Sequence, residues 1–300
     1  MKKVAAGVDI GGTNTVFGWV DIDGKIIWRS SVSTANFQSA KELVSEVCKQ
    51  LRSAAKGEAV GLGVGAPSAN YYTGCVEYAP NLNWQEIIPL QQYFEEEMNL
   101  PSIITNDANA AAIGEQVYGV AKGMKDFMMV TLGTGLGSGF VANGELIYGH
   151  DGFAGELGHT IIEPNGRPCG CGRRGCLETY ASATAMQKTA LELSGQEHSS
   201  EEVAKAAING QKWALEAFDF TAQKLGLALA NAVAITRPEA IVLFGGLAQA
   251  GELLFRPTKR YMEENLLYNY QNKVSLLPSA LSNADAAVLG ASALVWKLQQ

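Results

Sequence analysis

The sequence predicts an α/β protein of two lobes, each built around the same β-meander. A meander of strands and tight turns opens the chain at residues 4–33, and it recurs roughly 120 residues later at 127–148, a spacing too wide for a solenoid repeat. Ala- and Leu-rich helical patterns follow, the longest at residues 211–235. With 300 residues, 47% of them hydrophobic, the chain is long enough to bury a full core.

The first meander contains a turn suited to binding phosphate. A β-rich run at residues 4–10 ends in a turn of four residues, Gly11, Gly12, Thr13 and Asn14. Such a turn exposes several backbone N–H groups, and Thr13 adds a hydroxyl donor. Asp9 lies just before the turn, where it either holds a magnesium ion through water or is an ordinary carboxylate at a strand end.

The second meander repeats this arrangement. A buried strand is expected at residues 127–132, and a glycine-rich turn at 133–139 follows, containing Thr134 and Gly135. Each turn alone is compatible with an ordinary glycine-rich hairpin, but two of them facing one cleft would hold a nucleoside triphosphate from both sides. A further strand at 240–244 ends in a third turn, Gly245 and Gly246, against which an adenosine would lie flat.

Polar residues follow a short strand at residues 102–105. Asn106 and Asp107 stand at its carboxyl end, and the Ala-rich stretch behind them predicts a tightly packed helix. Asp107 therefore either caps that helix or acts as a general base at the edge where α/β sheets bind ligands.

A second polar segment, residues 80–84, precedes a helix expected at residues 87–97. It contains Asn81 and Trp84, and an amide beside an indole suits a sugar. Trp84 is otherwise expected as a core anchor.

Three of the five cysteines, Cys169, Cys171 and Cys176, fall close together after His159. A Cys₃His set suits a closed tetrahedral zinc site. The alternative is a disulfide with a spare thiol, which the Cys-x-Cys spacing disfavours. Glu156 stands three residues before His159, so the two side chains share a face if residues 155–160 begin a helix.

The net charge of −7 argues against nucleic acid or an anionic membrane surface as the main partner. No window of about 18 apolar residues is present, so no membrane span is expected. The N-terminal apolar run is too short for a secretory signal, and together with free cysteines this predicts a cytoplasmic protein.

Five motifs occur in a fixed order along the chain: DIGGTN at 9–14, TNDANAA at 105–111, LGTGLGSG at 132–139, AGELGH with CGCGRRGCLE at 154–178, and LFGG at 243–246. Together they resemble the ROK (repressor, open reading frame, kinase) family of sugar kinases and regulators, and within it the bacterial glucokinases. The resemblance implies the two-lobed actin-like ATPase (ribonuclease H-like) fold. The expected lobes are a small one of residues 1–115 plus the C-terminal helix 288–300, and a large one of 116–287 with a zinc loop at 159–176.

The resemblance also implies roles for individual residues, matched by motif position. Asp107 resembles the catalytic base that accepts the proton of the sugar 6-hydroxyl. The positions that resemble sugar contacts are Asn81, Asn106, Asp107, Glu156, His159 and Glu178. Those that resemble ATP contacts are Asp9, Gly11, Gly12, Thr13, Asn14, Thr134, Gly135, Gly245 and Gly246. Those that resemble the family's structural zinc ligands are His159, Cys169, Cys171 and Cys176.

The implied activity is that of a glucokinase of glycolysis: ATP-dependent phosphorylation of glucose, with Mg²⁺ accompanying ATP, a structural Zn²⁺ and a homodimeric assembly. Within the family, the alternatives are an N-acetylhexosamine (GlcNAc or ManNAc) kinase, a fructokinase, or a non-catalytic sugar sensor. A protein-directed actin-like or Hsp70-like ATPase is disfavoured by the cysteine cluster and by the sugar-type residues Asn106 and Glu156.

Two departures from the family pattern stand out. Ser68 follows Pro67 where the family often has glycine, which is expected to reshape the sugar pocket. The family's regulators carry an N-terminal helix-turn-helix, and since this chain starts at its first strand, no DNA-reading module is expected.

Overall fold

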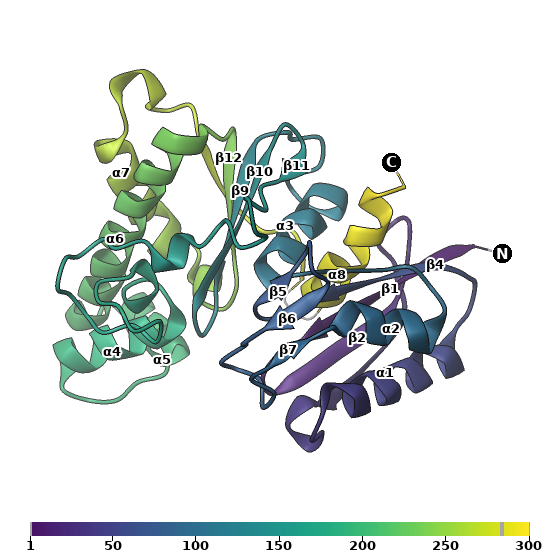
Figure 1. Cartoon of the computed structure of the whole chain (residues 1–300). Coiled ribbons are helices and arrows are strands. Elements are labelled where there is room, and N and C mark those ends of the chain that lie inside the picture. Colours follow the sequence, from purple (N-terminus) through teal and green to yellow (C-terminus); the bar gives the residue numbers. More distant parts are fainter. Residues whose placement is uncertain (1, 283–284, 300) are drawn as a thin grey trace. The chain divides into compact units, whose positions relative to one another are not determined.

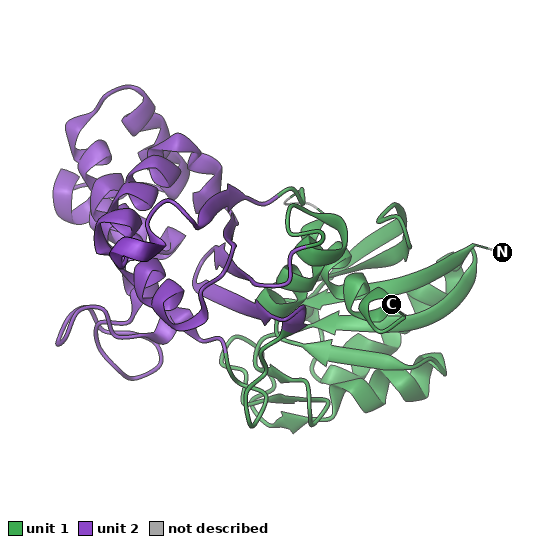
Figure 2. Cartoon of the chain, turned by 90° about the horizontal axis from the view of Figure 1, so that it is seen from above, with its two compact units in different colours: residues 1–123, 146–154, 280–300 green, residues 124–145, 155–279 purple. Residues whose placement is uncertain are grey.

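The computed structural model describes residues 2–282 and 285–299 and divides into two compact units. The first unit comprises Met1–Gly123, Leu146–Ala154 and Ala280–Gln300, and the second comprises Met124–Glu145 and Gly155–Ser279 (Figure 2). The first unit therefore extends beyond the N-terminal segment expected for the small lobe and includes a piece of the middle of the chain. The lobe boundaries given above stay a prediction.

A five-stranded sheet with the order β3-β2-β1-β4-β8 forms the centre of the first unit (Figure 1). Its strands are β1 (Lys3–Ile10), β2 (Asn14–Asp21), β3 (Ile26–Ser33), β4 (Glu58–Gly65) and β8 (Ser102–Thr105). The first three strands pair antiparallel as a meander, and β4 and β8 are added in parallel.

Helices cover both faces of this sheet. On one face, Val4, Ala6 and Val8 of β1 share a core with Leu43 and other apolar residues of α1 (Ala40–Ala54). On the other face lies α8 (Ala286–Lys297). Gly7 and Gly63 allow its close approach, because a Cβ at either position would collide with the backbone of α8. Burial on both faces explains why these strands are apolar almost throughout.

The second unit repeats the same topology. Its sheet has the order β11-β10-β9-β12-β13, with β9 and β10 antiparallel and with β9, β12 and β13 parallel. The strands are β9 (Phe127–Leu132), β10 (Leu136–Ala142), β11 (Glu145–Leu146), β12 (Ala240–Phe244) and β13 (Ser275–Pro278). The equivalent order of the two sheets confirms the duplicated meander predicted from the sequence.

The remaining elements complete each unit. The first contains α2 (Leu90–Met98), α3 (Asp107–Tyr118), the short turn η1 (Thr34–Asn36) and a small sheet of β5 (Ala69–Asn70), β6 (Cys75–Glu77) and β7 (Ile87–Ile88). The second contains α4 (Ala183–Ser194), α5 (Ser200–Ile208), α6 (Lys212–Thr236), α7 (Glu252–Asn265) and the short turns η2 (Leu157–His159), η3 (Leu177–Thr179), η4 (Leu247–Ala250) and η5 (Tyr268–Tyr270).

Two expected elements differ from the structure. The helix predicted at residues 87–97 begins only at Leu90, because residues 87 and 88 pair with β6 as the short strand β7. The helix start considered at residues 155–160 is only the 3₁₀ turn η2, and Glu156 before it has non-helical torsions of φ −79° and ψ 56°.

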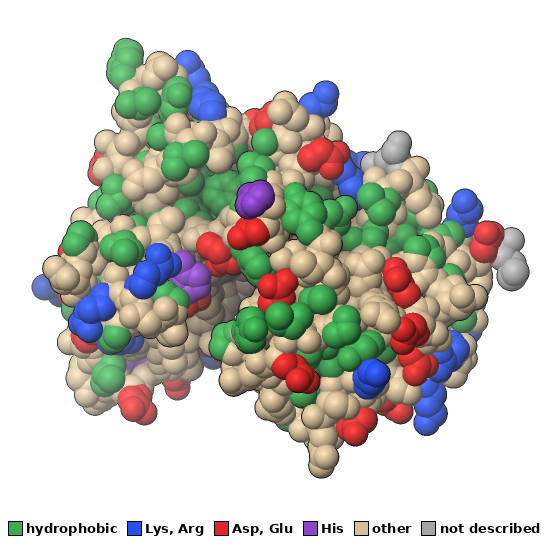
Figure 3. All heavy atoms as spheres, viewed as in Figure 1, with side chains coloured by type: hydrophobic (Ala, Val, Ile, Leu, Met, Phe, Trp, Pro, Cys, Tyr) green, Lys and Arg blue, Asp and Glu red, His purple; other side chains and the backbone are tan. Residues whose placement is uncertain are grey.

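No helix within residues 2–282 and 285–299 is both long and apolar enough to span a bilayer. Figure 3 shows acidic and basic side chains interspersed on the face in view, with apolar and uncharged groups between them.

Candidate active site and metal centre

The carboxyl ends of three parallel strands bring Asp9 and Asp107 together in the first unit. Asp9 lies beside Gly65 across β1 and β4, and Gly65 lies beside Thr105 across β4 and β8. Asp107 follows Thr105 by two residues. A Cβ at Gly65 would be 3.2 Å from Oδ1 of Asp9 and 3.6 Å from the Cα of Asp107. The absent side chain of Gly65 thus leaves the space in which the two acidic residues approach one another.

The surroundings of these two carboxyl groups favour their protonated forms. Burial raises the pKa of Asp9 from 3.8 to about 7, and the neighbouring charge of Asp107 adds to the shift. Surrounding protein atoms also raise the pKa of Asp107, although its side chain still reaches solvent and the backbone N–H of Ala108 opposes the shift. A carboxylate with a raised pKa is a stronger proton acceptor, as a general base requires.

The structure decides which residue caps α3. The Oδ1 atom of Asn106 accepts a hydrogen bond of 2.7 Å from the N–H of Asn109, so Asn106 is the N-cap. The capping role considered for Asp107 is therefore wrong, since Asp107 is the first helical residue. Within residues 2–282 and 285–299, the Nδ2 group of Asn106 has no hydrogen-bond acceptor.

The first glycine turn lies against the segment predicted to bind sugar. Within the turn, the N–H of Gly11 donates to the carbonyl of Asn14 at 2.9 Å. A Cβ at Gly12 would collide with the carbonyl oxygen of Asn81. Asn81 is exposed, whereas Trp84 is only 7% exposed and belongs to the core. The structure therefore favours the core-anchor role for Trp84.

The second glycine turn has a partner that the sequence analysis did not anticipate. Its N–H of Gly133 donates to the carbonyl of Gly135 at 3.1 Å, and the exposed Thr134 lies between them. The N–H of Leu136 donates to Oε2 of Glu178 at 3.0 Å. Nothing in the local sequence signalled this contact, because the two residues are joined only by the fold.

The third glycine turn lies beside the second. Gly245 has a φ of 102°, which favours glycine, and a Cβ there would be 2.6 Å from the carbonyl oxygen of Leu132 at the end of β9. Two glycine turns thus follow neighbouring parallel strands, β9 and β12, at the same edge of the second sheet.

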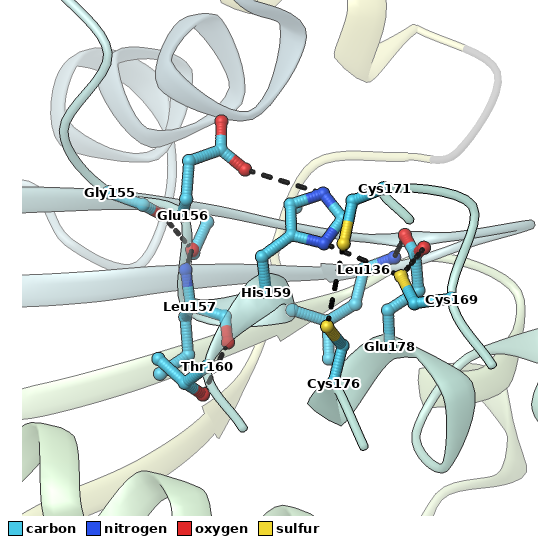
Figure 4. A network of polar contacts seen from close by, with 12 residues as sticks. Leu136, Gly155, Glu156, Leu157, His159, Thr160, Cys169, Cys171, Cys176 and Glu178 are labelled. Carbon is cyan, nitrogen blue, oxygen red and sulfur yellow. Dashed lines mark hydrogen bonds and ion pairs between the residues drawn. The ribbon is translucent and has the colours of Figure 1, made fainter. Parts of the chain in front are cut away.

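His159 and the three cysteines converge on one point (Figure 4). Nδ1 of His159 is 3.7 Å from Sγ of Cys169, and Sγ of Cys171 is 3.7 Å from Sγ of Cys176. All four ligand atoms lie within 4.8 Å of one another. Zinc–sulfur bonds of about 2.3 Å in a tetrahedron require sulfur atoms about 3.7 Å apart. The cluster therefore fits a tetrahedral ion, and its cysteines are free thiols rather than a disulfide.

The loop around these ligands folds back on itself. The N–H of Cys169 donates to the carbonyl of Arg173 at 2.9 Å, and Gly172 and Gly175 have φ values of 84° and 79°. Hydrogen bonding with Arg173 lowers the pKa of Cys171 from 9.0 to about 6, which favours the thiolate that binds metal.

The two ring nitrogens of His159 face different groups. While Nδ1 faces the cysteines, Nε2 is 3.9 Å from Oε2 of Glu156 (Figure 4). The Glu156 side chain is 54% exposed and that of His159 is 30% exposed. His159 therefore takes part in the Cys/His cluster with one ring nitrogen and presents the other beside an accessible carboxylate.

The ROK family profile matches residues 5–298. The chain belongs to the ROK family. Its fold agrees with this assignment, since solved ROK structures have the same two-sheet architecture.

Three similar proteins illustrate the range of the ROK family. A glucokinase of Halalkalibacterium halodurans is 36% identical, covering 96% of this chain and 94% of its own. The crystal structure of a ROK family glucokinase from Streptomyces griseus in complex with glucose and AMPPNP has a TM-score of 0.81 and 31% identity, covering 97% of this chain and 98% of its own. A xylose repressor of Bacillus spizizenii is 32% identical over 79% of this chain and 61% of its own length.

Proposed function

We propose that this ROK family protein is an ATP-dependent sugar kinase that phosphorylates the 6-hydroxyl of glucose. The observation that carries the proposal is the position of Asp107, at the end of a parallel strand beside Asp9 and in the same unit as a phosphate-type glycine turn. Similarity to two glucokinases over nearly the whole chain supports the choice of sugar and of phosphoryl donor.

In the proposed mechanism, Asp107 accepts the proton of the sugar hydroxyl as that hydroxyl attacks the γ-phosphorus of ATP. The bond from this phosphorus to the β,γ-bridging oxygen breaks, and ADP leaves with the electron pair. General-base assistance of this kind contributes about 10²–10⁴-fold, and positioning and charge stabilisation supply the rest. Phosphate oxygens would be bound by backbone N–H groups of two turns. The first turn contains Gly11, Gly12, Thr13 and Asn14, and the second contains Thr134 and Gly135. Gly245 and Gly246 would line the adenosine.

Asp9 is the residue assigned to Mg²⁺, which it would hold through water. A half-buried carboxyl whose pKa is raised to about 7 gains its charged form most readily when a cation lies nearby. When bound, Mg²⁺ neutralises negative charge on the phosphoryl group in transfer.

Sugar recognition is assigned to Asn81, Asn106, Glu156, His159 and Glu178. Carboxylate, amide and imidazole groups can each exchange hydrogen bonds with hydroxyls. The cluster of His159, Cys169, Cys171 and Cys176 would hold a structural Zn²⁺, because four protein ligands fill a tetrahedral shell and leave no open position. The ion would keep the His159 ring oriented toward the sugar.

A non-catalytic sugar sensor is the second candidate, favoured by the 32% identity to a xylose repressor. The two candidates differ in turnover, since a sensor binds the sugar without consuming ATP.

The deciding experiment measures sugar-stimulated ADP release with ATP and a panel of glucose, fructose, GlcNAc, ManNAc and xylose. We expect glucose to give the highest kcat/KM. Xylose should give none, because it lacks the sixth carbon and its hydroxyl. Sugar binding without ADP release would support the sensor, and preference for an N-acetylated sugar or fructose would reassign the substrate.

A further inference from the structure

Glu178 joins the cysteine-containing loop to the second glycine turn. Its Oε2 accepts the N–H of Leu136 at 3.0 Å, and its Oε1 is 4.0 Å from Sγ of Cys169 (Figure 4). The carboxylate reaches Leu136 only because Gly135 has no side chain, since a Cβ there would collide with Oε2. One carboxyl group thus touches a predicted phosphate turn with one oxygen and a predicted metal ligand with the other.

The turn is fixed by other contacts on the same side. The carbonyl of Gly133 accepts the N–H of Ala183, the first residue of α4, at 2.8 Å. In the described part of the chain, the backbone N–H groups of Thr134 and Gly135 have no recorded acceptor. Glu178 therefore occupies the Leu136 donor and leaves the two preceding donors for a ligand.

The segment that follows the turn is also attached to the loop of His159. The Ser138 hydroxyl, in a residue only 3% exposed, donates to the carbonyl of Gly155 and accepts the N–H of Leu157, the latter at 3.1 Å. A Cβ at Gly158 would collide with the carbonyl of Leu136. The start of β10 is thus held between the η2 turn and Glu178.

We infer that Glu178 is a positioning residue for nucleotide binding, in addition to any contact it makes with sugar. Its charge-assisted hydrogen bond holds the Leu136 amide, and so fixes the conformation in which the turn of Thr134 and Gly135 presents its free donors. This inference rests on the proposed function for the identity of the ligand, a nucleoside triphosphate. A residue next to the cysteine-containing loop would thus influence how tightly the protein binds nucleotide.

The test measures the Kd of a non-hydrolysable ATP analogue with Mg²⁺ in the absence of sugar, for the full chain and for Glu178→Ala and Glu178→Gln. Loss of the acceptor should weaken analogue binding about tenfold in Glu178→Ala. The Gln variant should recover most of that loss, because its amide oxygen still accepts from Leu136. Glu163→Gln is the matched control, since Glu163 lies in the same loop region but pairs with Lys224 at 2.5 Å.

A double-mutant cycle separates this role from damage to the fold. Gly135→Ala should also weaken analogue binding, because its Cβ displaces the Glu178 carboxylate. If the effect acts through that contact, the double variant Gly135→Ala with Glu178→Ala binds about as weakly as each single variant, whereas independent effects multiply. Zinc content and the unfolding transition of each variant show whether the loop remains intact.

Any one of three results would overturn the inference. The first is a folded, metal-loaded Glu178→Ala variant that binds the ATP analogue as tightly as the unmodified protein in the absence of sugar. The others are a double variant whose loss of affinity equals the product of the two single losses, and an unmodified protein that does not bind the analogue. If the protein binds the analogue but releases no ADP with any sugar, the proposed kinase activity is rejected. The Kd values would still show whether Glu178 positions the nucleotide-binding turn.

Discussion

Asp9 and Asp107 approach each other across Gly65 at the ends of three parallel strands, and burial, with a smaller contribution from the charge of Asp107, raises the pKa of Asp9. When both of these carboxyl groups are ionised and no cation is near, their repulsion raises the free energy of the folded state. The arrangement is easiest to explain if a base and a cation-binding group are required at the same point.

We predict that Asp9→Asn stabilises the protein at pH 8 in the absence of Mg²⁺ and nucleotide. The pKa of Asp9 rises from 3.8 to about 7 on folding, so between about pH 4 and 7 the folded state binds more protons than the unfolded state. Stability contributed by protonated Asp9 is therefore lost as the pH rises through this window. Removing the carboxyl should add at least about 1 kcal/mol to the free energy of unfolding at pH 8.

Urea unfolding at pH 4 and pH 8 tests this, with the gain confined to the higher pH. Asp23→Asn, at an exposed turn, is the control and should change neither value. A gain of equal size at both pH values would disprove a titration origin.

Removal of the metal should weaken sugar binding rather than abolish the fold of either sheet. Cys171→Ala removes one of four ligands, so we expect loss of bound zinc, disorder of residues 160–178 and a raised sugar KM through displacement of His159 and Glu156. Metal analysis and sugar titration measure both effects. Cys75→Ala, which lies outside the cluster, should retain zinc and sugar affinity. Full sugar affinity in metal-free protein would refute the link.

Ser68 has a φ of 51°, a left-handed conformation that costs most residues roughly 1–2 kcal/mol and glycine little. Glycine adopts this conformation without a Cβ clash, which agrees with the glycine expected here from the family resemblance. We predict that Ser68→Gly raises the free energy of unfolding by about 1 kcal/mol. Ser68→Ala keeps the strain and should not gain stability.

The same pair of variants tests the sugar pocket. The N–H of Ala66 donates to the carbonyl of Thr105 at 3.0 Å, so the chain segments that follow these two residues begin side by side. Ser68 lies two residues beyond Ala66, and Asp107 lies two residues beyond Thr105. A change in the preference among glucose, GlcNAc and ManNAc that is shared by both variants would assign selectivity to the hydroxyl. Unaltered preference in both would show that Ser68 does not shape the pocket.

Features with a strong local pattern were predictable from the sequence. The strands that end at Ile10 and Leu132 are apolar runs closed by glycine turns, and the structure has both at the predicted ends. The Cys₃His cluster was also predictable, because its ligands lie close in sequence and the intervening glycines permit a tight loop.

Features that depend on distant partners were not predictable. Asn106 and Asp107 are both good capping residues, and only the geometry of α3 shows that Asn106 caps it. Ile87 and Ile88 fit a helix as well as a strand until β6 is present to pair with them. The contact of Glu178 with Leu136 joins two motifs that the sequence assigned to different ligands.

The central claim is that Asp107 is the base of a sugar kinase. The most direct measurement is glucose-stimulated ADP release by Asp107→Asn, together with calorimetric glucose binding to the same variant. Asn preserves the hydrogen bond from the N–H of Ala108 but cannot accept the proton, so we predict a fall in kcat of at least about 100-fold with nearly unchanged glucose affinity. A near-normal kcat in this variant would contradict the account.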